Sequence, residues 1–314
     1  MTFPGFVQVD VDGLWAVRQC YGRAEGDTFR EDPCWEEGVP RLEGLFGELG
    51  VPAAFFIVGR DLEVDRKRRQ ARKLVHRGHE IGNHSYSHRL GLTGEPAGLI
   101  LDEIRRTDRS LRQLGAEPAG FRSPGYDVDG RILRALRRTG YIYDASLLPT
   151  YLGPLLRLAS SYVAGEWLFW RRQFGRISYG RAPRVPYFPR RHKIRKEAPR
   201  EEAPDLVEIP VGVTPGLHLP LTGGLLLTMT ESRRRDLFRR LARRGRPVLL
   251  LLHAIDGVDC RQPIVLDTRR PRLGGFAMSG GKKEARLRSI LSEFSRHFAI
   301  QPAGEYARRM LTEE

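Results

Sequence analysis

Cysteine is scarce in this chain of 314 residues, which has only Cys20, Cys34 and Cys260. An odd number of cysteines without a Cys-x-x-Cys spacing argues against a disulfide framework and against a cysteine-built zinc finger. The amino end also lacks a basic segment followed by an apolar one, so no signal peptide is visible. Both absences predict a protein of the reducing cytoplasm.

Acidic residues are also in short supply. The chain has 53 lysine and arginine residues against 38 acids, a formal net charge of +15, and an isoelectric point near 10.3. This excess favours anionic partners such as phosphates, nucleic acid or an acidic membrane surface. The basic residues are spread over several expected helices, and no RNP-like, zinc-finger or helix-turn-helix pattern is present. We therefore expect no nucleic-acid partner, although a basic nucleic-acid-binding protein is the non-enzyme alternative.

Short apolar runs alternate with helical periodicity along most of the chain. Strand-like runs include "FVQVDVD", "AAFFIVG", "EIGNHS", "YIYDASLL", "LVEIPVGV" and "PVLLLLHAI", and amphipathic patterns such as "DRKRRQARKLVHRG" lie between them. Strands that alternate with helices predict a parallel sheet with right-handed crossovers. Six or more such units favour a barrel over an open sheet.

Residues 148–205 break this rhythm. The stretch "LLPTYLGPLLRLASSYVAGEWLFW" is apolar and aromatic, but its prolines and charges make it a poor bilayer span. Residues 171–200 then hold eleven lysines or arginines and a single acid, Glu197. This composition indicates an interfacial membrane contact, and the alternative is a surface excursion whose aromatic side chains cover the barrel. We expect a single domain over residues 1–314 with an insertion at about 148–205.

The stretch "GHEIGNHSYSH" holds three of the eight histidines of the chain. His84 and His88 stand four residues apart, so a helical turn or a tight loop can direct both toward one ion. This spacing alone is a weak signal, because it arises often by chance. His79 is better explained as a packed histidine bonded to the backbone.

Two aspartates in the first expected strand strengthen the case for a metal. Asp10 and Asp12 in "VDVDG" are two residues apart, so both side chains point to the same face of the strand. They fall at its carboxyl end, where parallel barrels keep their active sites. Buried acids need a partner, and a cation is the simplest one. One aspartate with two histidines predicts a catalytic site for one divalent ion, with zinc as the default and cobalt, nickel or iron as alternatives.

Five motifs in this order give the chain a resemblance to a known family. "VDVDG", "EIGNHSYSH", "FRSPGY", "YDAS" and "LLLLHAI" resemble those of the polysaccharide deacetylases of the NodB homology group, carbohydrate esterase family four. The resemblance covers residues 6–147 and 206–256. It implies an α/β fold, a distorted (β/α) barrel, and metal-dependent removal of an N- or O-acyl group from a sugar.

The same resemblance implies a role for each matching residue. Asp12, His84 and His88 resemble the metal ligands, and Asp10 resembles the general base that deprotonates the attacking water. Arg122 resembles the arginine that orients this base. These roles suit the reaction, because an amide carbonyl is a poor electrophile and needs both polarisation and an activated water.

Further positions complete the implied site. His253 resembles the general acid that protonates the leaving amine, and Asp144 resembles an orienting acid near it. A backbone N–H near Gly125 and Tyr126 is expected to hold the oxyanion. Intact acids and histidines argue against the alternative of a metal-free barrel that only binds sugar.

Three positions depart from the common pattern of the family. A valine separates Asp10 from Asp12, where adjacent aspartates are usual. Gly125 precedes Tyr126, which leaves the identity of the oxyanion donor open. The tryptophan usually found after Asp144 is missing, which puts the hydrophobic wall of the acyl pocket in question and leaves room for hydrolysis of a cyclic amide instead.

The spaced "DVDG" start and "EGVPRLEGLFGELGVPAAFFIVG" are similar to the formamido-arabinose lipid deformylase branch. That resemblance implies an acetyl or formyl amide on a sugar carried by a polyprenyl phosphate. The apolar and basic insertion agrees with such a substrate. We expect a cytoplasmic hydrolase, peripheral on the inner face of the membrane, with a soluble or cell-wall polysaccharide as the alternative substrate.

Overall fold

The computed structural model describes residues 2–20, 26–164, 175–190, 193–199, 205–261 and 278–313. Its centre is an eight-stranded sheet in the order β10-β1-β2-β3-β4-β5-β8, with β9 on the other side of β1. Every pairing between these strands is parallel. The strands are β1 (Phe3–Val11), β2 (Ala54–Ile57), β3 (Glu80–Asn83), β4 (Gly120–Phe121), β5 (Tyr143–Asp144), β8 (Val207–Glu208), β9 (Val248–His253) and β10 (Phe298–Ile300).

The sheet curls into a half-barrel, as the alternation of strands and helices predicted. The continuous apolar runs of β2 and β9 form strands buried on both faces, which is typical of a parallel sheet covered by helices. The segment 209–222 runs between the chain that follows β5 and strand β9, and its backbone is hydrogen-bonded to both. The N–H of Val211 donates to the carbonyl oxygen of Leu147 at 2.9 Å, and that of Gly212 to Leu249 at 3.1 Å.

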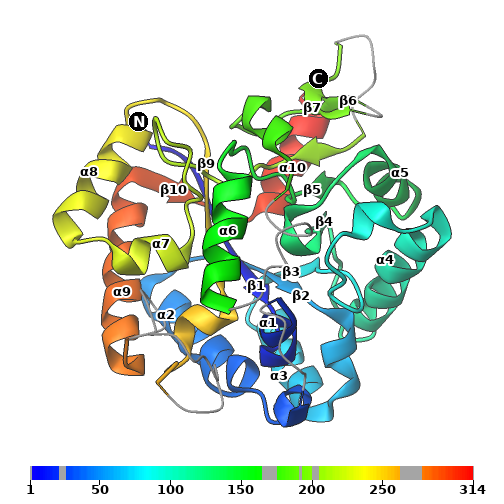
Figure 1. Cartoon of the computed structure of the whole chain (residues 1–314), viewed down its shortest axis with the longest axis horizontal. Helices are drawn as coiled ribbons and strands as arrows, with labels where there is room; N and C mark the ends of the chain where they lie inside the picture. The colour runs from blue at the N-terminus through cyan, green and yellow to red at the C-terminus, as the bar shows by residue number, and fades with distance from the viewer. Residues whose placement is uncertain are drawn as a thin grey trace.

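Helices cover the outside of the sheet (Figure 1). In Figure 1, α2, α8 and α9 lie on one side of it and α4 and α5 on the other. Capping residues set the ends of two of these helices. Gly50, with a φ of 61°, caps the carboxyl end of α2. Asp129 caps the amino end of α5, where its side chain accepts the N–H of Arg131. The helices are α1 (Leu14–Cys20), α2 (Val39–Leu49), α3 (Asp65–His76), α4 (Ala97–Arg112), α5 (Gly130–Arg138), α6 (Gly153–Ala164), α7 (Gly223–Thr228), α8 (Glu231–Ala242), α9 (Gly280–His297) and α10 (Ala303–Thr312).

The segment that breaks the rhythm of the sequence leaves the sheet between two neighbouring strands. β5 pairs directly with β8, so the chain between them is an excursion. Its described residues form α6 and an antiparallel pair, β6 (Pro189–Arg190) and β7 (Lys193–Glu197). The end of the aromatic stretch, at 165–170, and parts of the basic segment, at 171–174, 191–192 and 200, lie outside the described residues. No helix among the described residues has the length and apolar character needed to cross a membrane.

Candidate metal centre and active-site cleft

The carboxyl ends of β1, β3 and β9 bring the expected site residues together. Asp10 and Asp12 lie at the end of β1, and Asp10 is in register with His253 at the end of the adjacent β9. His84 follows β3 directly, and His88 lies one short loop further on. Residues more than 200 positions apart in the sequence therefore share one edge of the sheet.

Asp12, His84 and His88 converge on one point, as the metal prediction requires. The Nε2 atoms of His84 and His88 lie 3.1 and 3.2 Å from Oδ1 of Asp12. One ligand atom from each residue lies within 4.8 Å of the other two, and all three side chains are buried. Oδ1 of Asp12 still accepts no hydrogen bond. A buried carboxylate oxygen that faces two imidazole nitrogens in this way is suited to bind a cation together with them.

A backbone contact fixes which nitrogen of His84 faces this point. Its Nδ1 atom lies 2.7 Å from the carbonyl oxygen of Arg122. A carbonyl oxygen only accepts, so Nδ1 carries the proton and Nε2 keeps its lone pair. Metal-binding histidines are commonly oriented by this kind of contact.

The electrostatics of the trio keep Asp12 ionised. Burial by itself raises the pKa of this carboxyl, but the interactions of the carboxylate with the side chains of His88 and His84 outweigh burial. The net result is a pKa well below the ordinary value for aspartate. An anionic ligand beside two imidazoles suits a divalent ion.

The loop between the two histidines adopts an unusual backbone that one acid holds in place. Ser85 and His88 have φ values of 60° and 50°, in the left-handed region that side chains rarely adopt. Glu103 on α4 accepts the backbone N–H of Tyr86 at 2.9 Å and that of Ser87 at 2.8 Å, and also accepts the Ser87 hydroxyl at 2.7 Å. One buried carboxylate thus binds three donors of the loop that directs His88.

Asp10 is held by a buried arginine. Nη1 of Arg122 donates to Oδ1 of Asp10 at 2.8 Å, and its Nη2 donates to the side chain of Gln8. The Nε atom of Arg122 donates to the carbonyl oxygen of Ala145 at 2.9 Å, and the guanidinium packs on the ring of Phe56. Arg122 has no solvent exposure. Because all three guanidinium nitrogens of Arg122 donate hydrogen bonds, the side chain holds one position and fixes the orientation of the Asp10 carboxylate.

His253 faces the second oxygen of Asp10. Its Nε2 atom lies 3.7 Å from Oδ2, and its side chain is 26% exposed, whereas those of Asp10 and Arg122 are 4% and 0% exposed. The backbone N–H of His253 donates to Oδ2 of Asp256 at 2.9 Å, which anchors the end of β9. The imidazole therefore points into the cleft from a fixed backbone, with room for a substrate beside it.

Asp144 contacts Ser146 and lies beside Glu208, and no hydrogen bond joins it to His253 among the described residues. The Ser146 hydroxyl donates to its Oδ1 atom at 2.5 Å, and a second buried acid, Glu208, is its neighbour on β8. Burial raises the pKa of Asp144 to about 6, against the hydrogen bonds from Glu208 and Ser146, and burial together with Asp144 raises the pKa of Glu208 well above its ordinary value. The two acids form a proton-sharing pair, and the orienting role of Asp144 toward His253 stays a prediction.

Gly125 and Tyr126 lie in a strained turn at the cleft. Their φ values are 66° and 62°, and the left-handed region is costly for tyrosine. The N–H of Tyr126 donates to the carbonyl oxygen of Ser123 at 3.2 Å. Burial raises the pKa of the Tyr126 hydroxyl, so it stays protonated. The turn lies at the cavity, as expected for a backbone N–H that holds the oxyanion. Which N–H of the turn has this role stays a prediction.

One cavity of about 390 Å³ is lined by the acids Asp10 and Asp12, the histidines His84, His88 and His253, and the turn at Gly125 and Tyr126. Its remaining walls are largely apolar. They include Val17, Leu90, Leu156, Leu219, Pro220, Leu225 and Ile255. Leu156 and Leu219 occupy a wall of the cleft although the tryptophan expected after Asp144 is missing.

A buried charge network beneath the site escaped the sequence analysis. Lys67 donates to Asp32 and to Asp61, at 2.6 Å each, and Asp61 accepts the indole N–H of Trp15 at 2.8 Å. The ring of Trp15 meets that of His88 edge-on. Two acids share one cation, and burial raises the pKa of Asp32 to about 6. No local motif marks these residues, because the three lie on separate segments.

Comparison with known proteins finds a similarity to one family over part of the chain. The profile described as polysaccharide deacetylase matches residues 28–143. A peptidoglycan deacetylase of Helicobacter pylori is 29% identical over 144 residues, which cover 45% of this chain and 48% of that protein. A chitooligosaccharide deacetylase of Bradyrhizobium is 31% identical over 121 residues, covering 35% of this chain and 52% of that protein. The chain thus spans about half the length of these curated relatives.

The solved structures agree on the fold. A Mycobacterium smegmatis protein assigned to the polysaccharide deacetylases superposes with a TM-score of 0.65 at 17% identity, covering 99% of this chain and 91% of that one. The family profile includes His84, His88 and Arg122, but it stops short of Asp10, Asp12 and His253. Those three residues join the site through the geometry of β1 and β9.

Proposed function

We propose that this chain, which carries a polysaccharide deacetylase domain, is a metal-dependent amide hydrolase that removes an N-acyl group from a sugar. The observation that carries the proposal is the arrangement around Asp10. Its two carboxylate oxygens face Arg122 and His253, and the Asp12–His84–His88 trio opens onto the same cavity. A base, an acid and three metal-binding atoms therefore surround one space.

The trio fits a divalent ion. Three buried ligand atoms meet, the Asp12 oxygen lacks a hydrogen-bond donor, and Nδ1 of His84 is already committed to the backbone. A bound ion polarises the acyl carbonyl and makes water a stronger nucleophile at neutral pH. The open side of the trio faces the cavity, where an acyl group can reach it.

Asp10 accepts the proton of the attacking water. Its Oδ1 atom is bonded by Arg122, so Oδ2 is the atom directed toward the cavity side and His253. The buried guanidinium also prevents the carboxylate from turning toward the metal ligands. Water oxygen bonds to the acyl carbon as this proton leaves it, which forms a tetrahedral intermediate.

His253 donates the proton that the leaving amine needs. Breaking the C–N bond releases an amine that is a poor leaving group until its nitrogen is protonated. The imidazole is the accessible member of the acid–base pair, and its Nε2 atom lies 3.7 Å from Oδ2 of Asp10. The products are a carboxylic acid and a free amino sugar.

For the substrate we propose an acetyl or formyl amide on a lipid-linked sugar at an anionic membrane surface. In the described chain, the large hydrophobic side chains that remain exposed are confined to residues 151–177 and to the loop 214–219: Tyr151, Leu155, Leu158, Ile177 and Leu217. The hydroxyl of Tyr151 donates to the carbonyl oxygen of Gly216 at 2.8 Å, which joins the two segments. Their neighbours Leu156 and Leu219 line the catalytic cavity.

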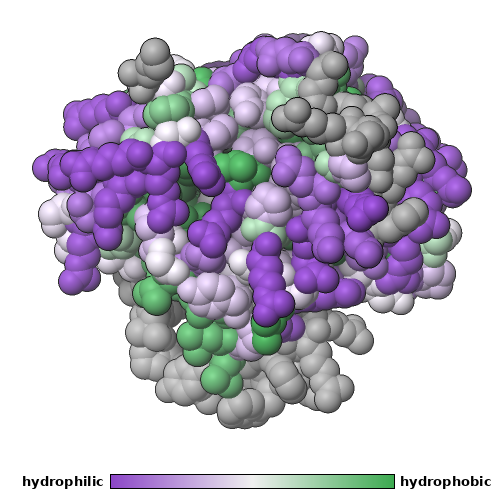
Figure 2. All heavy atoms as spheres, turned by 90° about the horizontal axis from the view of Figure 1, so that it is seen from above, coloured by the Kyte–Doolittle hydropathy of each residue, from purple (hydrophilic) through white to green (hydrophobic). Residues whose placement is uncertain are grey.

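This apolar rim belongs to a chain with a formal net charge of +15. In Figure 2, hydrophilic side chains dominate the face, and hydrophobic ones form small separate patches, some of them toward its lower edge. Exposed hydrophobic groups beside basic ones are typical of proteins that rest on anionic membranes. A sugar held at such a surface would enter the cavity from its rim.

A product screen by mass spectrometry tests the reaction. The zinc-loaded protein is incubated with N-acetylated chitooligosaccharides and with short-chain prenyl-phosphate sugars that carry acetyl or formyl amides. We expect a mass loss of one acyl group from the prenyl-linked compounds. Loss only from the chitooligosaccharides would retain the hydrolase and reject the lipid-linked substrate.

The His84→Ala variant provides the control for the site. Without the Nε2 ligand, we expect both zinc content and product to fall to background, whereas His76→Ala, on the outer helix α3, leaves both unchanged. Full activity of His84→Ala would contradict the proposed mechanism.

A further inference from the structure

A second pocket lies away from the catalytic cleft. It has a volume of about 520 Å³ and shares no lining residue with the cavity of the candidate active site. Its walls come from residues 182–185, from Gly212 and Val213, and from Leu241, Arg244 and residues 246–248. Val248, at the start of β9, lines this pocket, and His253, at the end of β9, lines the catalytic cavity. A strand rises about 3.3 Å per residue, so the two residues lie about 17 Å apart along β9.

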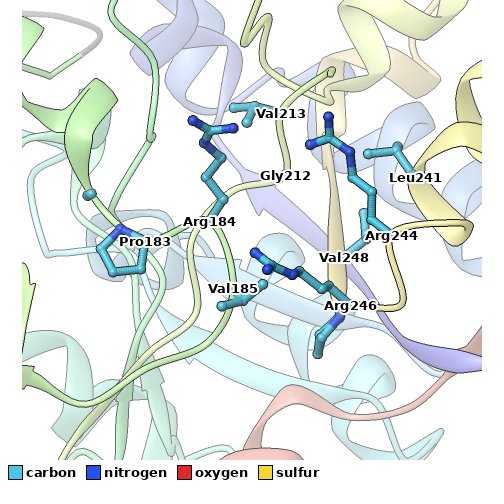
Figure 3. A pocket seen from close by; sticks show the side chains of 11 residues that line it. Pro183, Arg184, Val185, Gly212, Val213, Leu241, Arg244, Arg246 and Val248 are labelled. Carbon is cyan, nitrogen blue, oxygen red and sulfur yellow. The ribbon is translucent and has the colours of Figure 1, made fainter. Parts of the chain in front are cut away.

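Three guanidinium groups line this pocket. Arg184 stands on one wall, and Arg244 and Arg246 stand on the opposite wall (Figure 3). Within the described ranges none of the three forms an ion pair, whereas on α8 Arg235 pairs with Glu231 and Arg240 with Asp236. The pocket thus concentrates positive charge without an internal counterion.

The positive field of the pocket reaches a neighbouring histidine. His218 is buried, and its ring stacks at a tilt on Tyr151. Burial first, and then the charges of Arg184 and Arg244, lower the pKa of His218. The histidine therefore stays neutral and adds no charge to the cluster.

The arginines project from a rigid apolar frame. Val213, Leu241 and Val248 are buried at the base of the pocket. Pro183 precedes Arg184 and Pro247 follows Arg246, and each proline restricts the backbone beside it. Gly245, with a φ of 67°, turns the chain between Arg244 and Arg246, and hydrogen bonds of 3.1 and 3.0 Å to the last turn of α8 hold that turn. Rigid backbones lower the entropy lost when these side chains order around a ligand.

We propose that this arginine pocket binds the phosphate group of a phosphate ester. A guanidinium presents paired donors that match two phosphate oxygens, and three of them neutralise a dianion. The apolar base raises the strength of these contacts relative to open water. The ester is either the head group of an anionic lipid or a free phosphate ester, because both present the same oxygens. The proposal is independent of the hydrolase function, since no pocket residue belongs to the catalytic cleft.

Calorimetric titration of the full chain with glycerol 3-phosphate, at fixed ionic strength, tests the pocket directly. We expect saturable binding that Arg244→Gln and Arg246→Gln each weaken about tenfold or more, since each removes charged hydrogen bonds. Arg243→Gln is the matched control, because Arg243 is exposed, adjacent in sequence and outside the pocket. It removes the same charge, and we expect unchanged affinity.

Flotation with phosphatidylcholine vesicles, with and without phosphatidylglycerol, identifies the source of the phosphate. The proposal is supported if glycerol 3-phosphate, phosphatidylglycerol vesicles or both bind, and if Arg244→Gln and Arg246→Gln bind more weakly than Arg243→Gln. Stronger binding to the vesicles indicates a lipid head group, and stronger binding to glycerol 3-phosphate indicates a free phosphate ester. Equal losses in Arg243→Gln and Arg244→Gln would mean that general charge attraction operates, and would overturn the pocket. Absence of binding to both probes would overturn it as well.

Discussion

At the scale of single residues, Asp10 is the most informative position, because its two oxygens have different partners. Asp10→Asn keeps an oxygen that accepts from Arg122 but removes the basic oxygen opposite His253. We expect the rate of amide hydrolysis to fall about 10²- to 10⁴-fold, the range associated with loss of a general base. Zinc content and the free energy of unfolding should stay close to those of the unaltered protein.

Measuring kcat together with zinc content separates this effect from loss of the metal. Asp27→Asn, at an exposed position outside the cleft, provides a control for the charge change. An Asp10→Asn protein with undiminished kcat would show that another group accepts the proton.

The pair of Asp144 and Glu208 gives a prediction on pH. Burial raises the pKa of both carboxyls, so the folded protein binds their protons more tightly than the unfolded chain. Their contribution to stability is therefore full in acid, and is lost as pH rises from the ordinary carboxyl pKa of about 4 through a pKa of about 6 for Asp144. Folding at neutral pH carries this cost.

Glu208→Gln tests that sign. The amide still offers a donor to Asp144 but cannot ionise, so the variant should gain stability over the unaltered protein as pH rises from about 5 to about 8. We expect a difference of about 2–3 kcal/mol in the free energy of unfolding by urea at the upper end. Glu117→Gln, at an exposed site, should show a flat difference. A difference that falls with pH would contradict the shared-proton description.

At the scale of elements, α4 positions the metal-binding loop through Glu103. This carboxylate accepts three hydrogen bonds from Tyr86 and Ser87, between the two histidines. In Glu103→Ala we expect the free energy of unfolding to fall by about 1–3 kcal/mol, because the loop amides lose their acceptor in a buried place. We also expect zinc affinity to fall about 10- to 100-fold, as for loss of an outer ligand contact.

Competition with a zinc chelator measures the second effect. Asp102→Ala removes a neighbouring acid from the exposed face of the same helix and should leave zinc affinity unchanged. Glu103→Gln, which retains one accepting oxygen, should lie between the two. Zinc affinity that is unchanged in Glu103→Ala would show that the loop holds its shape alone.

The elements were predictable wherever their pattern was long or strongly apolar. The runs that begin at Phe6, Ala53 and Pro247 became β1, β2 and β9, and the amphipathic pattern "DRKRRQARKLVHRG" became α3. The short elements α1, α7 and β10 were not predicted. Each has fewer than eight residues, too few for a period to be read, and tertiary packing rather than propensity stabilises them.

The site followed the same division between local and distant information. The histidine pair and the two aspartates stand close in sequence, so their spacing identified them. Glu103 and Asp61 look like ordinary acids of a polar helix and loop, and only the folded chain turns them toward Ser87 and Trp15. The partner of Asp144 was missed for the same reason, because Glu208 lies on a strand some sixty residues later.

At the scale of the whole molecule, the sheet separates two kinds of chemistry. The carboxyl ends of β1, β3 and β9 carry the metal-binding trio and the acid–base pair, and the amino end of β9 borders the arginine pocket. A parallel sheet permits this separation because every strand presents its two ends to different surfaces. The net charge of +15 then attracts anions to both.

Attraction by net charge and insertion of hydrophobic groups respond differently to salt, and this difference tests membrane docking by the whole protein. Charge attraction between exposed groups weakens with salt, because the screening length is about 10 Å at 0.1 M and about 3 Å at 1 M. Burial of Leu155 and Leu217 in lipid does not weaken. We expect the unaltered protein to retain measurable binding to phosphatidylglycerol vesicles in 1 M salt.

The double variant Leu155→Ser/Leu217→Ser should bind phosphatidylglycerol vesicles at low salt, and this binding should disappear in 1 M salt. Each buried leucine contributes about 2 kcal/mol, so the loss of both weakens partitioning by two to three orders of magnitude in roughly additive fashion. Ala299→Ser, at an exposed position of β10, controls for added polarity away from the rim. If the double variant and the unaltered protein show the same salt dependence, the exposed leucines do not enter the membrane, and the surface of the protein meets lipid through charge alone.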